Sequence, residues 1–170
     1  MGKPFSVNAY RFDPYKKFLF RLYFEESATP VAGMSKVSGG LMRSSPPIVY
    51  PEGGNAITRT SPGRTTYAAI TLERGVTHDS DFETWANAVQ VLDKGAPSQS
   101  LKNLRKEIRI ELLNEAGQPV LGYIVHACWV SEYLALSDLD AGANAIAIEH
   151  IKLENEGWER LTELTEPTQI

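Results

Sequence analysis

The sequence has few of the residues on which disulfides, metal sites and many catalytic sites depend. Its 170 residues include one cysteine and three histidines. The single cysteine, Cys128, excludes an internal disulfide and argues against a secreted, disulfide-stabilised scaffold. Paired cysteine or histidine at metal-ligand spacing is missing, as are a P-loop and a dinucleotide-binding glycine motif. We therefore predict no catalytic, cofactor-binding or metal-binding residues.

The sequence also lacks an excess of positive charge and a long apolar run. The formal net charge is -4 at pH 7, which argues against a generally basic nucleic-acid-binding protein. No apolar run approaches the ~20 residues needed to span a bilayer, and the N-terminus shows no apolar segment of a secretory signal. The length and the 42% hydrophobic fraction are ordinary for one soluble globular domain.

Residues 61–92 contain the one helix that the sequence clearly predicts. Ser61-Pro62-Gly63 has the composition of a turn, and residues 65–72 are rich in β-branched and aromatic residues, as in a strand. A capping-box pattern at residues 80–83 marks the start of the helix, and Gly95 is placed to follow its end. Between these signals the apolar residues recur at helical spacing, at Phe82, Trp85, Val89 and Leu92.

Alternating patterns predict further strands at residues 17–25, 31–37, 106–113, 120–130 and 145–153. The first two are expected to form a hairpin. Residues 106–113 and 120–130 are expected to pair around a turn at residues 114–118, where Gly117 supplies a positive φ. Both faces of residues 120–130 are apolar, and the apolar face of residues 145–153 changes midway, which suggests a bulge. The predicted fold class is mainly antiparallel β, a barrel or sandwich, with one flanking α-helix.

Three segments lack a clear pattern: an N-terminal arm at residues 1–15, residues 38–62, and a C-terminal tail at residues 155–170. Residues 38–62 are rich in proline and glycine, and such a long segment without structure is unusual inside a compact domain. It is either a surface loop or an extended arm ordered by a partner. Its apolar residues favour the arm, because linkers rarely carry Ile48, Val49, Tyr50 and Ile57.

Several polar residues admit a catalytic or ligand-binding interpretation. His78-Asp79-Ser80 contains the residue types of a hydrolase triad, but triads assemble from distant positions, so helix capping explains Asp79 and Ser80 better. His126 lies within an apolar strand and is expected to be structural. Arg59, Arg64 and Arg74 flank the central strand, where exposure to solvent or ion pairs between subunits explain them better than phosphate binding.

Short motifs occur in a recognisable order over nearly the whole chain, at residues 18–22, 37–39, 61–64, 70–76, 85–87, 110–117 and 147–151. The most distinctive is the Asn114-Glu115-Ala116-Gly117 turn. Together the motifs resemble the tail tube proteins of contractile-tailed bacteriophages and the related inner-tube proteins of contractile injection systems.

The resemblance implies a single tail-tube domain over residues 1–170. It implies hexameric rings that stack into a tube inside a contractile sheath and form a conduit for DNA delivery into the host. The implied partners are further copies of the chain, the tail sheath protein, the baseplate tube initiator, the tail terminator, and the tape measure protein and phage DNA inside the lumen, with no membrane anchor. The implied location is the virion tail, assembled in the bacterial cytoplasm.

Within this reading, residues 38–62 would grip an adjacent ring or subunit, and the polar faces of residues 17–25 and 106–113 are candidates for the lumen wall. Two alternatives stay close to it: the inner tube of a phage-derived bacteriocin and that of an extracellular contractile injection system. The long proline- and glycine-rich segment and the N-terminal extension favour the phage. Two more distant alternatives are a monomeric ligand-binding β-barrel and an enzyme on a β scaffold.

Overall fold

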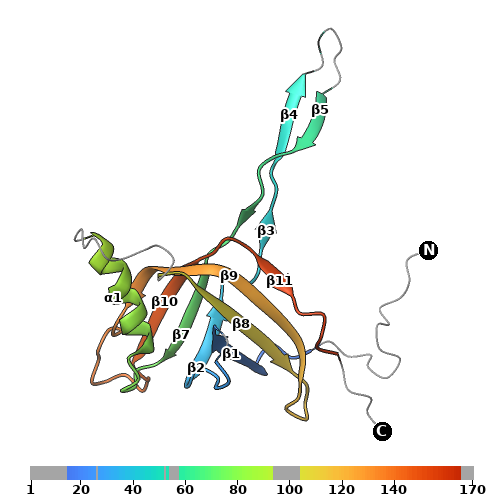
Figure 1. The fold of residues 1–170 in the computed structure, drawn as a ribbon. Coiled ribbons are helices and arrows are strands. Elements are labelled where there is room, and N and C mark those ends of the chain that lie inside the picture. Colours follow the sequence, from blue (N-terminus) through green and yellow to red (C-terminus); the bar gives the residue numbers. More distant parts are fainter. Residues whose placement is uncertain (1–14, 26, 52, 54–57, 94–103, 166–170) are drawn as a thin grey trace.

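A computed structural model of the chain describes residues 15–165, except residues 26, 52, 54–57 and 94–103 and the side chains of residues 91–93. Its main sheet has seven antiparallel strands, with β11 paired to β9 beside the path β1-β8-β9-β10-β7-β2. The strands are β1 (Phe20–Phe24), β2 (Met34–Ser38), β7 (Ile70–Gly75), β8 (Lys106–Leu113), β9 (Pro119–Leu134), β10 (Ile148–Glu154) and β11 (Trp158–Arg160). The helix α1 (Asp81–Asp93) lies at one end of the sheet, and a separate hairpin projects from the sheet (Figure 1). The predicted mainly antiparallel β fold with a flanking helix is confirmed.

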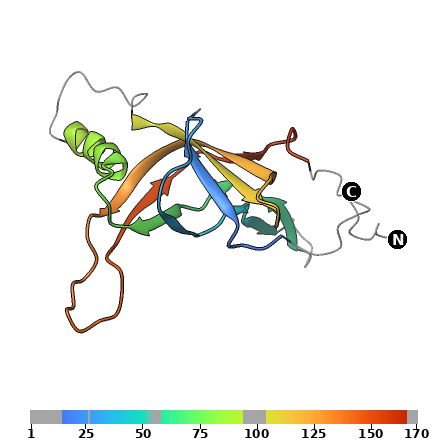
Figure 2. The ribbon, with the colours of Figure 1, turned by 90° about the horizontal axis from the view of Figure 1, so that it is seen from below.

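The sheet is curled, as the view from below shows (Figure 2). It encloses one apolar core. Its two end strands, β1 and β2, approach each other, because the N–H of Val31 just before β2 donates to the carbonyl of Leu22 in β1 at 2.7 Å. The core is formed by Leu22, Ile70, Leu72, Phe82, Trp85, Ile108, Ile110, Val125, Cys128, Val130, Ile151 and Leu153. In the described part of the chain, no helix is long and apolar enough to cross a membrane.

The long strand β9 bends in the middle and serves both halves of the sheet. Its first half pairs with β8 and β11, and its second half pairs with β10. Ala127 at the bend has a φ of 51°, a left-handed conformation that reverses which side chains face inward. Val125 and Cys128, which strict alternation would place on opposite faces, are therefore both buried in the core. The two apolar faces predicted for residues 120–130 thus reflect one inward face that changes at the bend.

The predicted hairpin between residues 17–25 and 31–37 is wrong. β1 pairs with β8, and β2 pairs with β7 at the other end of the strand order. β1 is also shorter than predicted, because it begins at Phe20 and Glu25 turns out of it with a φ of 53°. The apolar residues of β1 face those of β8, so contacts across the core decide the pairing instead of proximity in sequence.

The other hairpin follows the prediction closely. β8 spans the predicted residues 106–113, and Gly117 in the turn has a φ of 78°. Asn114 orders the turn, because its side-chain Oδ1 accepts hydrogen bonds from the N–H groups of Ala116 and Gln118. Local turn chemistry is therefore sufficient to predict this hairpin.

Two predicted segments have different boundaries in the structure. Ser61 and Pro62 end a strand, not a turn, and residues 65–72 divide into a short strand and β7. The last strand starts only at Ile148, and its core-facing set does not change: Glu149, Ile151 and Leu153 all point inward. The irregularity predicted there lies in the pairing of β10 with β9, where the register shifts between Lys152 and Leu153.

The helix matches its predicted range. The first backbone bond runs from the N–H of Thr84 to the carbonyl of Ser80, and the carboxylate of Asp79 accepts the N–H of Asp81 at 2.9 Å. Phe82 and Trp85 are buried as predicted, and Val89 packs partly against the core. The side chain of Leu92 and all of Gly95 lie outside the described residues.

Trp85 anchors the helix, so replacing it by phenylalanine is expected to destabilise the fold by about 1–3 kcal/mol. Its Nε1 donates to the carbonyl of Leu104 at 2.8 Å, and its ring meets Phe24 edge-on. The variant leaves that buried carbonyl without its donor. Urea unfolding followed by circular dichroism measures the loss. Trp158→Phe is the matched control, because Trp158 Nε1 is buried without a hydrogen-bond partner among the described residues; an equal loss in both variants would contradict the hydrogen-bond argument.

Candidate assembly surfaces

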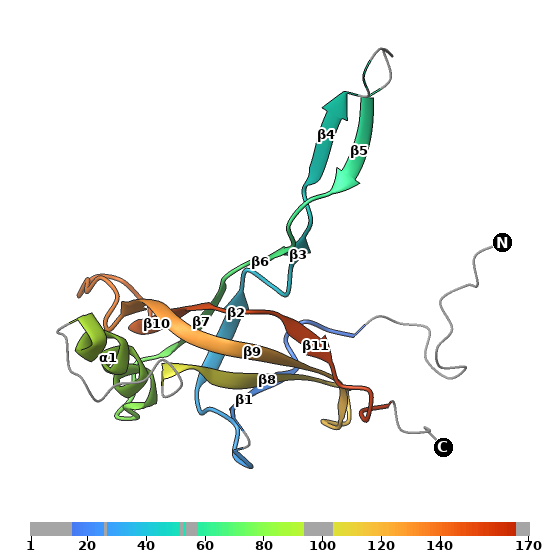
Figure 3. The ribbon, with the colours of Figure 1, turned by 45° about the horizontal axis from the view of Figure 1, so that its top comes forward.

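The most prominent surface feature is a long hairpin that stands away from the sheet (Figures 1 and 3). This projecting hairpin, residues 43–67, consists of a base pair of strands, β3 (Arg43–Ser44) with β6 (Thr66–Tyr67), and an outer pair, β4 (Pro47–Pro51) with β5 (Thr58–Pro62). Most of the predicted irregular segment 38–62 is therefore regular β structure. The sequence does not reveal this structure, because neither β4 nor β5 has a buried face that would impose an alternation of apolar and polar residues.

Gly63 allows the two parts of the projecting hairpin to join. Its N–H donates to the carbonyl of Pro46 at 2.8 Å. A Cβ at residue 63 would lie 2.4 Å from that carbonyl oxygen, so no other residue fits without moving the backbone. The close approach lets β4 and β5 continue the ladder that β3 and β6 begin.

The projecting hairpin exposes apolar side chains that the described part of the chain leaves uncovered. Ile48 is 54% and Val49 60% exposed, and Tyr50 beside them is also exposed. Its described charged side chains, Arg43, Arg59 and Arg64, are all basic. An exposed apolar ladder on an extended arm marks a surface that binds another protein.

A second apolar surface lies on the connection between β9 and β10, residues 135–147. Leu139 is 74% and Ile146 80% exposed, and Leu136 is exposed beside them. Val76, exposed after β7, joins this surface, because its N–H donates to the carbonyl of Ala147 at 3.0 Å. We call these residues the loop patch. Its charged side chains, Asp138 and Asp140, are acidic.

A buried ion cluster holds the start of α1 against the sheet. Arg74 of β7 is 0% exposed. Its Nε donates to Glu149 of β10 at 2.6 Å, and its Nη2 donates to the carbonyl of Asp79 at 2.8 Å. The Asp79 carboxylate lies 3.2 Å from Nη1, and the guanidinium lies over the ring of Phe82 at 4.0 Å. Arg74 therefore links two strands to the helix.

This cluster contradicts the prediction that Arg74 is a surface residue or a partner in an ion pair between subunits. The alternation within each strand indicates this burial. Arg74 lies an even number of residues from buried Ile70 and Leu72, and Glu149 lies two residues from buried Ile151, so each faces the core. Two opposite charges in core-facing positions of neighbouring strands predict a buried pair.

Two of the three histidines contact surface carboxylates. His126 contacts Glu107 at 3.0 Å and Glu159 at 3.6 Å, and its hydrogen bond with Glu107 raises its pKa above the usual value. His150 contacts Glu132 at 3.3 Å, and His78 is exposed. Among the described residues, no group of His, Cys, Asp or Glu side chains could hold a metal ion. Cys128 is free and buried, and its burial raises the pKa of its thiol to about 12.

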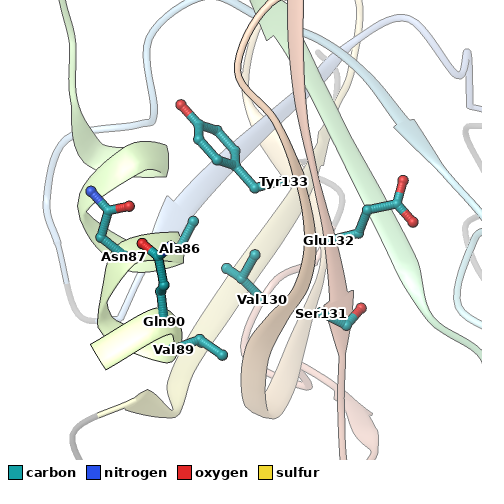
Figure 4. Close-up of a pocket in the computed structure, with 8 residues that line it drawn as sticks. All are labelled: Ala86, Asn87, Val89, Gln90, Val130, Ser131, Glu132 and Tyr133. Atoms are coloured by element: carbon teal, nitrogen blue, oxygen red, sulfur yellow. The ribbon is translucent and has the colours of Figure 1, made fainter. Parts of the chain in front are cut away.

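An open groove of about 430 Å³ runs between α1 and the second half of β9 (Figure 4). Val130 and Tyr133 point toward the helix, whereas Ser131 and Glu132 point away from it. The helix lines the other side of the groove with Ala86, Asn87, Val89 and Gln90. The lining residues pair no acid with a base, so this arrangement fits packing better than catalysis.

The outer face of β2, β7, β10 and the second half of β9 is polar and of mixed charge. Lys36 lies 3.9 Å from Glu73, and Lys152 stands on the same face. β2 and the second half of β9 end this four-strand unit, and in the described chain neither has a further strand partner along its outer edge. Both edges are therefore open to pairing with another chain.

The outer face of β8, predicted as a candidate lumen wall, is partly covered. Glu107, Arg109 and Glu111 line a hollow of about 710 Å³ together with residues 159–164. A Cβ added at neighbouring Gly122 would lie 2.8 Å from a side-chain carbon of Leu164, so the C-terminal segment rests directly on this face.

Comparison with known proteins gives a family match. The model described as "T4-like virus tail tube protein gp19" matches residues 16–159. A search of curated proteins finds no significant match. The match confirms the resemblance noted in the sequence.

Solved structures show the same fold. A chain in the sheath-tube complex of an extracellular contractile injection system, PVC, in its extended state is 23% identical, with a TM-score of 0.71 over 87% of this chain and 91% of that chain. A chain in the cap of the anti-feeding prophage is 21% identical, with a TM-score of 0.73 over 94% and 99%. Hcp1 from Flavobacterium johnsoniae is 12% identical, with a TM-score of 0.53 over 84% and 94%. Since the family match spans most of the chain, the protein belongs to the T4-like virus tail tube protein family and is a structural subunit of an inner tube.

Proposed function

We propose that this chain assembles into hexameric rings that stack into the inner tube of a contractile phage tail and form a conduit for DNA delivery. The observation that carries the proposal is the open four-strand unit on a tail tube fold: a polar outer face bounded by the two free edges of β2 and β9. Edge-to-edge pairing of such units around a ring would join them into one large barrel. A head-to-tail contact of this kind is heterologous and closes when its rotation permits.

The polar face of the four-strand unit is our proposed lumen wall, in place of the partly covered face of β8. Lys36 and Lys152 are balanced there by Glu73, Glu132 and Glu154. A wall without an excess of cations lets a polyanion pass without binding to it. Chemistry of this kind suits DNA, with a tape measure protein occupying the lumen before delivery.

The projecting hairpin is our proposed assembly arm. None of its described residues belongs to the apolar core, and its exposed Ile48 and Val49 need a cover from another copy. Within this assembly, a single domain over residues 1–170 contributes all contacts, and the terminal segments 1–15 and 155–170 add to stacking. The chain's role is mechanical and not enzymatic.

The partners we propose are the tail sheath protein, the baseplate tube initiator and the tail terminator. Related folds occur in a sheath-tube complex, a baseplate and a sheath/tube terminator of contractile injection systems. Location in a virion tail assembled in the bacterial cytoplasm follows from the phage assignment. The inner tube of a bacteriocin or of an extracellular injection system is the second candidate, favoured by the similarity to the PVC and anti-feeding prophage chains.

Negative-stain electron microscopy across a concentration series tests the function. We expect rings at low concentration and hollow tubes of constant bore at high concentration, because each ring exposes the surfaces that bind the next. Baseplate components added as a template extend the test to nucleated assembly. A monomer at every concentration, with and without the template, would reject the tube and favour the ligand-binding barrel.

A further inference from the structure

We propose that the projecting hairpin of one copy docks on the loop patch of a neighbouring copy. The inference rests on the proposed tube function and specifies which surface receives the arm. The hairpin contributes Ile48, Val49 and Tyr50, and the loop patch contributes Leu136, Leu139, Ile146 and Val76.

The first argument is that both surfaces are apolar and uncovered. Most large aliphatic side chains of this fold lie in the core, whereas these lie on two outlying segments. Exposed apolar groups that cluster on segments without a core role typically bind another surface. Burying them against each other removes both from water.

The second argument is complementary charge. The described charged residues of the hairpin are Arg43, Arg59 and Arg64, whereas the loop patch carries Asp138 and Asp140. Opposite charges around an apolar centre set the register and exclude like-charged alternatives. With Glu52 counted from the sequence, the hairpin still carries a net positive charge, whereas the loop patch is negative. The charges therefore favour the mixed contact over hairpin-to-hairpin and loop-to-loop contacts.

The third argument is geometry. The hairpin stands away from the sheet, and the β9–β10 connection lies beside α1 at a separate end of the molecule (Figures 1 and 3). A hairpin therefore meets a loop patch only on a different copy. Two different surfaces that bind each other between copies make a heterologous contact, which propagates along an assembly without limit or closes into a ring.

The loop patch is also ordered enough to act as a receptor. The N–H of Ser137 donates to the carbonyl of Ile148 at 2.9 Å, and the N–H of Ile148 donates to Ser137 Oγ at 3.0 Å. Asp140 Oδ1 accepts the N–H of Gly142 at 2.9 Å, which closes a tight turn at the tip. A surface that is already shaped loses less conformational entropy on binding.

Cysteine cross-linking tests the contact. We expect full-length protein carrying Val49→Cys together with Leu136→Cys, Leu139→Cys or Ile146→Cys to assemble under reducing conditions. Mild oxidation of the assemblies should then give a ladder of covalent multimers on denaturing gels. The natural Cys128 does not interfere, because it is buried and its pKa is about 12.

The matched control carries Val49→Cys with Ala116→Cys, which is exposed on the β8–β9 turn outside the loop patch. A ladder in the patch variants and not in the control supports the contact. Tubes that form normally but give no ladder in any patch variant, or an equal ladder in the control, would overturn it while leaving the tube function intact. Failure of the unsubstituted protein to assemble, even on a template, would instead reject the tube function and this contact with it.

Charge reversal gives an independent measurement. Arg59→Glu or Asp138→Lys alone is expected to abolish most assembly, and the two together are expected to restore it, because the double variant exchanges the signs. Unchanged thermal unfolding of each variant shows that the fold is intact. Equal assembly by single and double variants would contradict the charge argument.

Discussion

A protein in which residues 47–62 are replaced by an Asn-Gly turn is expected to fold normally and to form no tubes. The replaced segment contains β4 and β5, which pair with each other and with no other strand described. Pro46 and Gly63 already lie within hydrogen-bonding distance, so a two-residue turn can join them. The barrel core loses none of its buried residues.

The measurement pairs electron microscopy with thermal unfolding. The expected result is complete loss of tubes with an unchanged unfolding midpoint. A variant with Ile48→Thr and Val49→Thr is the matched control, because it keeps the hairpin length and strand propensity while removing apolar surface. We expect reduced assembly from this control. Tubes of normal length from the truncated protein would show that the hairpin is not an assembly arm.

Replacing Arg74 by alanine is expected to destabilise the folded subunit by about 3–5 kcal/mol. Arg74 is fully buried, and its removal leaves Glu149, itself buried, without its 2.6 Å partner. The variant also removes the hydrogen bond to the carbonyl of Asp79 and the cation over Phe82. Most of this cost comes from the Glu149 carboxylate, which stays buried without its counterion. The lost packing contributes less, and any truncation of a buried side chain would cause it.

Chemical denaturation of single and double variants checks the argument. Arg74→Met with Glu149→Met is expected to recover most of the lost stability, because neither charge then remains in the core. Arg74→Ala with intact Glu149 is expected to be the least stable of the set. A loss below about 1 kcal/mol in Arg74→Ala would mean that water reaches the cluster and screens it.

Short-range patterns in the sequence predicted the elements that are stabilised by contacts between residues close together in the chain. The helix at residues 81–93 and the β8–β9 hairpin carry capping residues, an apolar stripe and a turn glycine within a few positions of one another. Motif order over nearly the whole chain predicted the family, and the family model confirmed it. These predictions needed no knowledge of which distant residues meet.

Pairing between distant strands and exposed regular structure were not predictable in the same way. β1 and β2 alternate as a hairpin would, yet they pair with β8 and β7 because the core contacts are made there. The projecting hairpin has no buried face and hence no alternation that would reveal its strands. The burial of Arg74 is different, because Arg74 lies on the same strand face as buried Ile70 and Leu72 and the alternation therefore indicates it.

Short-range patterns in the chain were therefore enough to predict the fold class, the helix, the β8–β9 hairpin and the family, because capping, turn and alternation signals act over a few residues. The strand order and the separation of the projecting hairpin from the loop patch could be read only from the folded chain. Strand pairing is settled by contacts between residues far apart in the chain, which compete through the whole core and leave no short-range pattern in the sequence.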